Sequence, residues 1–200
     1  MSPSHILIAR QEDIPPEVVG DFTTTLSELS IPFQAEETER RIFNALEYYI
    51  PTALVIFLAK PFFDAFLKKA GEDSYVLFKR GLGALVSRAS RIKVRIISNS
   101  PQKISETSPY SRVVSIYSHS PSGARIKFLL PAEDSEDECL QIIDSILSLL
   151  RENHAGDSDD QLSRILSTTK TRSLKVLRYD SDSASWHLLE PSYVSKSRKA

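Results

Sequence analysis

The stretch from Ile42 to Leu67 reads IFNALEYYIPTALVIFLAKPFFDAFL and is the most apolar part of the chain. Two prolines, at positions 51 and 61, divide it, because proline ends or kinks a helix and is rare inside a sheet. The middle part, 53–59, has no amphipathic period and contains two β-branched residues, which is typical of a strand covered on both faces. A buried helix remains the alternative for this part. In either case we expect the stretch to form the core.

The same stretch has about the length of a membrane-spanning helix, so a membrane-active role through residues 50–67 is one alternative for the protein. A spanning helix needs about 20 consecutive, predominantly apolar residues. Here Lys60 and Asp64 interrupt the apolar residues well before that length, in addition to the prolines. We therefore expect a buried element rather than a membrane span.

The first 90 residues alternate between strand patterns and helix patterns. Apolar residues recur at helical spacing after Asp13, after Thr38, after Lys60 and after Asp73 or Ser74. Short apolar or extended segments at 5–9, 31–35 and 53–59 separate these helices. A β-α-β-α-β-α order of this kind predicts an open, mostly parallel, three-layer sheet with 53–59 as its central strand.

Beyond Arg91 the pattern changes from helical spacing to alternation. A half-buried strand is predicted at 92–96, and two β-hairpins at 113–130 and 173–189 are predicted around the turns 119–123 and 180–183. Asp134 or Ser135 begins a long helix with acidic residues in its first turn, and a short helix follows at 162–166. The sequence thus predicts a mixed α/β fold, with an α/β half over 1–90, a hairpin-rich α+β half over 91–191 and a loose tail over 192–200. The two halves can also form one compact domain.

Composition places the chain among ordinary globular proteins. Of its 200 residues, 41% are hydrophobic and 26% are charged, and the formal net charge is −1, so wholesale disorder is not expected. With Cys139 as the single cysteine, an intramolecular disulfide is impossible, which fits a reducing compartment. The N-terminus shows neither a basic leader nor a long apolar region, so no signal peptide is expected. We expect a cytoplasmic protein of bacterial type.

No motif for catalysis or metal binding stands out. There is no G-x-S-x-G sequence, and the four histidines form no H-x-H or H-x-x-x-H pair. The catalytic residues therefore stay unassigned, and we expect no metal and no cofactor. The glycine pair Gly81 and Gly83 falls inside a helical period, so it indicates close helix packing rather than a phosphate loop. Cys139 is expected to be unreactive, because neighbouring carboxylates raise the pKa of a thiol.

Two groups of side chains are candidate binding sites. The first is a ligand crevice formed by Glu36 and Glu37 at the end of one predicted strand and by Lys60 and Asp64 after the next. The expectation rests on analogy, since ligands of parallel sheets collect at the carboxyl ends of the strands.

The second candidate is an anion-binding face. It consists of cations on the polar sides of predicted strands, which would hold phosphates if the strands are neighbours: Lys93, Arg95, Arg125 and Lys127. Two observations count against this face: the acidic cluster at 133–138 can neutralise it, and no exposed aromatic residues are interleaved for base stacking.

These observations favour a soluble, intracellular, non-catalytic interaction or accessory protein whose partner is another protein. A nucleotide- or nucleic-acid-related enzyme or sensor, acting at the strand ends or on the basic face, is the first alternative. Membrane activity through 50–67 is the second.

Overall fold

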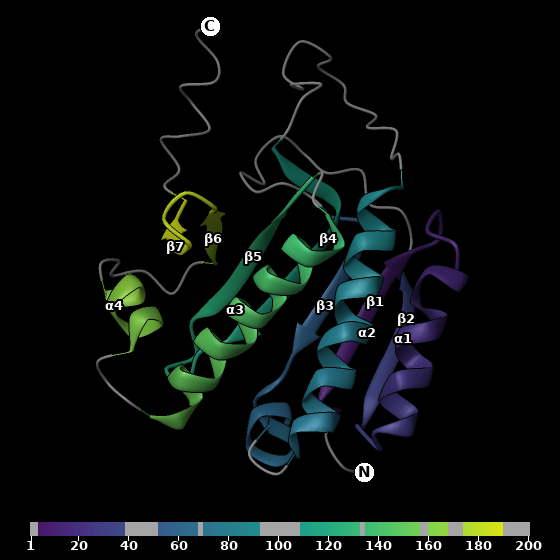
Figure 1. Ribbon diagram of the computed structural model, residues 1–200, viewed down its shortest axis with the longest axis horizontal. Coiled ribbons are helices and arrows are strands. Elements are labelled where there is room, and N and C mark those ends of the chain that lie inside the picture. The colour runs from purple at the N-terminus through teal and green to yellow at the C-terminus, as the bar shows by residue number, and fades with distance from the viewer. Residues whose placement is uncertain are drawn as a thin grey trace, which may run out of the picture.

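The computed structural model describes residues 4–38, 52–67, 70–92, 109–132, 135–156, 160–167 and 174–189. These residues form a mixed α/β fold, as predicted, built on one seven-stranded sheet with the strand order β2-β1-β3-β4-β5-β6-β7 (Figure 1). The strands are β1 (Ile6–Gln11), β2 (Phe33–Thr38), β3 (Leu54–Leu58), β4 (Tyr110–His119), β5 (Arg125–Pro131), β6 (Lys175–Asp180) and β7 (Ser185–Leu188). The helices are α1 (Glu17–Glu28), the π-helix η1 (Phe62–Leu67), α2 (Glu72–Ser90), α3 (Glu136–Ala155) and α4 (Gln161–Ser167).

The direction of the strands differs from the mostly parallel expectation. The pairs β1–β2, β3–β4 and β5–β6 are parallel, whereas β1–β3, β4–β5 and β6–β7 are antiparallel. Strand patterns record which side chains are buried but not which way the strand runs, so the sequence did not reveal that β3 opposes β1. The sheet is therefore mixed.

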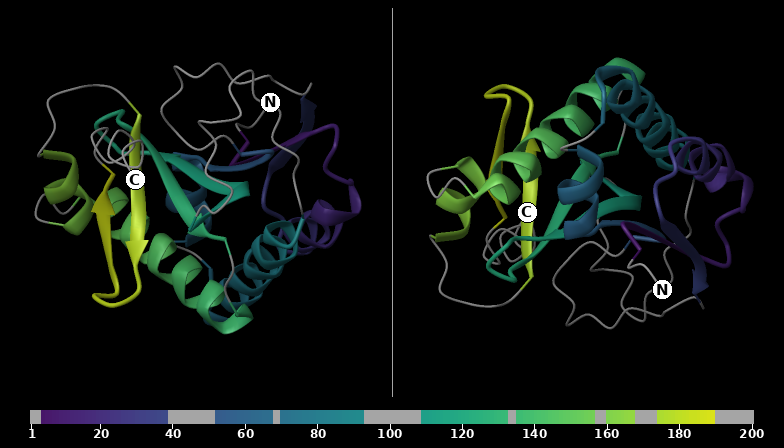
Figure 2. Two further views of the ribbon diagram at one scale, coloured as in Figure 1. Left: turned by 90° about the horizontal axis from the view of Figure 1, so that it is seen from above. Right: turned by 90° about the horizontal axis from the view of Figure 1, so that it is seen from below.

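Helices α1, α2 and α3 cover the same face of the sheet, as the views from above and below show (Figure 2). The three-layer expectation is wrong for the helices that the structure describes, because helical spacing shows that a helix has an apolar stripe but not which face of a sheet it covers. The core lies between this helix layer and the sheet. Its fully buried side chains include Ile8, Ile56, Phe78, Phe128 and Ile143.

The apolar stretch 42–67 contains an interior strand of the sheet. Residues 54–58 form β3, which pairs with β1 on one side and with β4 on the other, so the strand alternative is confirmed over the buried-helix alternative. β4, rather than β3, is the middle strand of the seven. This pairing of β3 with β4 joins strands from both predicted halves in one sheet.

Both predicted hairpins, the long helix after Ser135 and the short helix at 162–166 are confirmed. Two boundaries need correction. Thr38 is the last residue of β2, paired with Gln11, instead of the first of a helix. Gly71 is the N-cap of α2 instead of the end of the helix before it. The predicted helix at 39–50, the strand positions 93–96 and the tail at 192–200 lie outside the described residues.

The glycine pair in α2 permits close helix packing, as predicted. A Cβ atom on Gly83 would lie 2.5 Å from Leu140 Cδ2 of α3, and a Cβ atom on Gly81 would lie 3.1 Å from the Thr25 side chain of α1. At Gly83, Cys139 also approaches, with its Sγ 3.6 Å from the backbone oxygen of the glycine. The two glycines thus let α2 pack closely between α1 and α3.

No described helix combines the length and the apolar character that crossing a bilayer requires.

Candidate functional site

The residues of the predicted ligand crevice lie at opposite ends of the strands instead of together at one end. Glu37 pairs with Arg10, which in turn pairs with Leu54 at the start of β3, whereas Lys60 follows the end of β3. The 5 residues of β3 therefore separate the two pairs of side chains, which is roughly 15 Å along a strand. The cause is the antiparallel β1–β3 pairing, which reverses β2 relative to β3.

Charged residues from both parts of that predicted crevice already form ion pairs within the fold. The exposed Glu37 forms an ion pair with Arg10, and Lys60 Nζ donates to Asp64 Oδ2 at 2.6 Å. Glu36 is exposed beside Glu37 on the edge strand β2. Of the four residues, the structure brings together Lys60 with Asp64 and Glu36 with Glu37.

The predicted anion-binding face also changes. Lys93 and Arg95 lie outside the described residues, and Arg125 is exposed. Lys127 was expected on a polar face, but it is only 1% exposed. Its burial lowers the pKa of the amine to about 8, and its Nζ lies 5.3 Å from the centroid of the Tyr117 ring. A buried lysine does not offer its charge to a large anion at the surface.

The β6–β7 hairpin holds a serine, a histidine and an aspartate that resemble a catalytic triad in composition only. Ser185 Oγ lies 2.9 Å from His187 Nε2, and Asp180 Oδ2 lies 3.8 Å from the same nitrogen. A triad needs one ring nitrogen for the serine and the other for the carboxylate. Here both contacts are to Nε2, so the three residues do not form a triad. We interpret their contacts as part of the structure of the hairpin.

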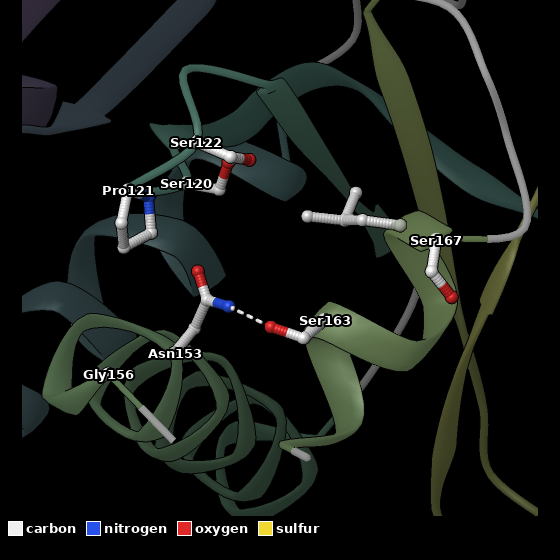
Figure 3. A pocket seen from close by; sticks show the side chains of 8 residues that line it. Ser120, Pro121, Ser122, Asn153, Gly156, Ser163 and Ser167 are labelled. Atoms are coloured by element: carbon white, nitrogen blue, oxygen red, sulfur yellow. Dashed lines mark hydrogen bonds between the residues drawn. The ribbon is translucent and has the colours of Figure 1, made fainter. Parts of the chain in front are cut away.

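A pocket of about 360 Å³ lies where three elements meet: the tip of the β4–β5 hairpin, the C-terminal end of α3, and α4 (Figure 3). This volume is within the range of small-molecule sites, roughly 300–1,000 Å³. We call it the serine pocket, after the hydroxyl groups in its wall. Its lining is Ser120, Pro121, Ser122, Asn153, Gly156, Ser163, Leu166 and Ser167.

Asn153 is the most constrained polar group of the serine pocket. The residue is 5% exposed, and its Nδ2 donates to Asp160 Oδ2 at 3.1 Å and to Ser163 Oγ at 3.0 Å. Since a carboxylate only accepts, Asp160 fixes which end of the amide is the nitrogen. The amide oxygen, Oδ1, is buried and has no hydrogen-bond partner in the described part of the chain, and in Figure 3 it points toward Pro121 and Ser122.

The hydroxyl groups around Asn153 are used unequally. Ser163 donates to Asp160, Ser167 donates to the backbone oxygen of Arg164, and Ser120 accepts from the backbone of Ala124. Ser120 and Ser122 share one hydrogen bond of 2.7 Å. Each hydroxyl has one proton and two lone pairs, so the described hydrogen bonds use most of the protons and leave lone pairs open. The serine pocket therefore offers mainly acceptors.

Asp160 gives this end of the molecule a buried negative charge. Burial by itself raises the pKa of the carboxyl, but hydrogen bonds from Ser163, Asn153 and the Leu162 backbone outweigh it and hold the pKa below its usual value. The carboxylate is therefore ionised at neutral pH. Its hydrogen-bond donors are neutral groups.

His154, the neighbour of Asn153, belongs to a second polar group on the η1 side. Its ring stacks on Phe63 with centroids 4.4 Å apart and planes at 10°. Burial lowers its pKa, and the opposing effects of the His119 backbone and Asp64 are smaller. The imidazole is therefore neutral at physiological pH, and it lies near the Lys60–Asp64 pair without forming a catalytic arrangement with it.

Across the seven described segments, no group of three or more histidine, cysteine, aspartate or glutamate side chains is placed to hold a metal ion.

The sequence did not single out the serine pocket. Its polar residues lie in the predicted hairpin turn 119–123, in the last turn of α3 and in the 7-residue helix α4. Serine and asparagine are ordinary turn residues. The one usable signal is that Asn153 falls in the last turn of a helix, on its buried side, where an amide needs partners.

The fold and the site were compared with known proteins. No protein-family model, no curated protein sequence and no solved structure matches this chain. Evidence for a function therefore comes from the residues of the site.

Proposed function

We propose that this protein is a non-catalytic accessory or sensor protein that binds a small polar molecule in the serine pocket. The observation that carries the proposal is the amide oxygen of Asn153, which is buried in the wall of the pocket without a donor. A buried acceptor without a hydrogen bond costs about 1–3 kcal/mol. A ligand that donates to this oxygen would recover that cost.

The chemistry of the lining favours binding over catalysis. Its polar side chains are four serines and one asparagine, groups that do not gain or lose protons near neutral pH unless a base activates them. None of the described hydrogen bonds of these serines goes to a histidine or a lysine. Such a lining can orient a ligand by hydrogen bonds, while Pro121 and Leu166 provide apolar contact.

The two alternative functions receive less support. A basic face for nucleotides or nucleic acid would have to do without Lys127, which is buried. Membrane insertion of residues 50–67 would have to withdraw β3 from between β1 and β4 and expose Leu54 and Leu58, which are fully buried. Each apolar side chain of this size contributes about 1.5–3 kcal/mol when buried, so withdrawal is costly.

The test is a ligand screen on the full chain with small polar metabolites, followed by ligand-observed NMR, comparing the wild type with Ser122→Trp. Ser122 is exposed at the mouth of the pocket, so the indole is expected to obstruct ligand entry without disturbing the core. Ser183→Trp, at the exposed turn of the other hairpin, is the matched control. We expect at least one compound that binds the wild type and the control but not Ser122→Trp. A screen without hits, or hits that bind all three proteins equally, would refute the proposed function.

A further inference from the structure

We propose that the ligand of the serine pocket carries a primary ammonium group, which donates to Asn153 Oδ1. This inference rests on the proposed function, and it names the ligand class from the donors, acceptors and charge around the pocket. Three independent features of the described residues make the site favour a cationic donor over an anion.

The first feature is the excess of acceptors. Asn153 Oδ1 has no donor, and the hydroxyl protons of Ser163 and Ser167 are already given to Asp160 and to the Arg164 backbone. An ammonium group has three donors and no acceptor, so it complements such a wall. A phosphate or carboxylate has only acceptors, and it would leave Asn153 Oδ1 unpaired.

The second feature is the charge behind the wall. Asn153 Nδ2 donates to the ionised Asp160, and the same amide presents its oxygen on the other side. A hydrogen bond to a charged acceptor polarises the amide, which makes its oxygen a stronger acceptor. In addition, Asp160 is 6% exposed, so water screens its attraction for a nearby cation only in part.

The third feature is the position at the end of α3. The serine pocket lies at the C-terminal end of this 20-residue helix, with Gly156 as the C-cap and Asn153 in the last turn. The C-terminus of a helix carries a partial negative charge and favours cations. No lysine, arginine or histidine is among the lining residues, so nothing in the wall opposes this bias.

Access to Asn153 Oδ1 runs past the hairpin tip. The oxygen is buried, whereas Pro121, Ser122 and Gly123 are exposed, and Gly123 has open space around it. A ligand that donates to this oxygen must therefore displace the tip. Binding is therefore expected to shift the backbone NMR signals of 120–124 more than those of the 181–184 turn.

The experiment compares three sugars that share one skeleton and differ in charge: glucosamine, glucose and glucose 6-phosphate. Each is titrated into the full chain by NMR at a pH where the amine is protonated. We expect glucosamine to bind about tenfold more tightly than glucose, since a charge-assisted hydrogen bond is roughly twice as strong as a neutral one. Glucose 6-phosphate is expected to bind more weakly than glucose.

A pair of variants separates the charge from the shape of the site. Asp160→Asn removes the carboxylate but keeps a good N-cap for α4, and Asp182→Asn removes a carboxylate from the exposed turn of the other hairpin. The preference for glucosamine over glucose is expected to fall about threefold or more in Asp160→Asn, as charge assistance is lost, and to stay unchanged in Asp182→Asn.

Two kinds of result overturn the inference. If glucose or glucose 6-phosphate binds as tightly as glucosamine at a site that Ser122→Trp blocks, the ligand class is wrong while the proposed function stands. The class is also wrong if none of the three sugars binds although a compound without an ammonium group binds at the site that Ser122→Trp blocks. If no compound of any kind binds, the proposed function fails together with the inference.

Discussion

Burial of the Lys127 amine makes the stability of the fold depend on pH in a way that an experiment can isolate. Burial lowers the pKa of this amine from 10.5 to about 8. Between these values the unfolded chain holds a proton that the folded chain has released, so raising the pH favours the folded state. From about pH 8 to pH 10, stability is expected to rise from this group by up to roughly 1.4 kcal/mol per pH unit.

Lys127→Met should remove this dependence. The free energy of unfolding, measured by urea denaturation at several pH values, is expected to rise less steeply for the variant than for the wild type over this range. Tyr75→Phe is the control up to about pH 9, because the pKa of Tyr75 is raised from 10.0 to about 12 in the folded protein and the phenol stays protonated in both states below that pH. Equal slopes for Lys127→Met and the wild type would contradict the assignment.

Gly83 is a second residue whose role can be isolated. A Cβ atom there would lie 2.5 Å from Leu140 Cδ2, whereas a Cβ atom on Gly20 of α1 would meet nothing within 4 Å. We expect Gly83→Val to lower the free energy of unfolding by about 1–3 kcal/mol through overpacking. Gly20→Val, in an equally regular helix, should change it little or raise it by a few tenths, since valine is a better helix former. A similar effect of both variants in thermal denaturation would show that helix propensity, rather than packing, governs Gly83.

The elements of this fold differ in how well the sequence specifies them. The strand over 54–58 and the two hairpins follow from local patterns, namely a short apolar run between prolines and turn residues between alternating segments. The direction of β3 relative to β1 does not follow, because burial patterns are the same for parallel and antiparallel neighbours. The sequence predicts that Thr38 begins a helix because apolar residues recur at helical spacing after it, but the backbone of Thr38 pairs with Gln11 in the sheet.

The candidate site was less predictable than the fold. Glu36, Glu37, Lys60 and Asp64 were grouped by a rule for parallel sheets, and the antiparallel β1–β3 pair separates them. The serine pocket brings together residues more than 30 positions apart, and only the tertiary structure, in which α4 packs on α3 and the tip of the β4–β5 hairpin lines the same pocket, makes them neighbours. Individually they have the residue types of any turn.

The N-terminal end of α3 offers a test at the scale of one element. Ser135 and Glu138 form a capping box, with Ser135 Oγ accepting from the Glu138 backbone at 3.2 Å and the Glu138 carboxylate accepting from the Ser135 backbone at 2.9 Å. Ser135→Ala is expected to lower the free energy of unfolding by about 1 kcal/mol. Ser27→Ala, at an exposed position inside α1, should leave stability unchanged within a few tenths.

The capping box also has a pH signature. Hydrogen bonds from Ser135 lower the pKa of Glu138, so the stabilisation is present above the ordinary glutamate pKa and is lost as the pH falls through the lowered value. The difference between the wild type and Ser135→Ala, followed by circular dichroism, should therefore shrink toward low pH. A difference that stays constant into the acid range would mean that the cap does not act through the Glu138 carboxylate.

At the scale of the whole molecule, the β3–β4 pair connects two sets of strands that the sequence analysis described as halves. Trp186 is the single tryptophan, is 2% exposed, and lies on β7, where its Nε1 donates to Ser145 of α3. Its fluorescence therefore reports on the C-terminal side. Ile56 of β3 is fully buried on the other side of that junction.

Ile56→Ala should reveal whether the sheet unfolds as one unit. Removing a buried isoleucine side chain costs about 2–5 kcal/mol, and in a cooperative molecule the Trp186 transition in urea should move to lower concentration together with the circular dichroism transition. Leu77→Ala, at an exposed apolar side chain of α2, is the control and should move neither. If the fluorescence midpoint of Ile56→Ala stayed at the wild-type value while the circular dichroism transition moved, the two sides would unfold separately.

The strand order also bears on how the chain folds during its synthesis. From β3 onward, each new strand takes its place next to the strand made just before it, in the order β3-β4-β5-β6-β7. The nascent sheet can therefore grow in one direction as residues leave the ribosome, with the newest strand always at the open edge. The last strands to emerge, β6 and β7, complete that edge, and α4, synthesised just before them, closes the serine pocket. A chain stalled after α3 would carry the hairpin and Asn153 but not the wall that turns them into a binding site.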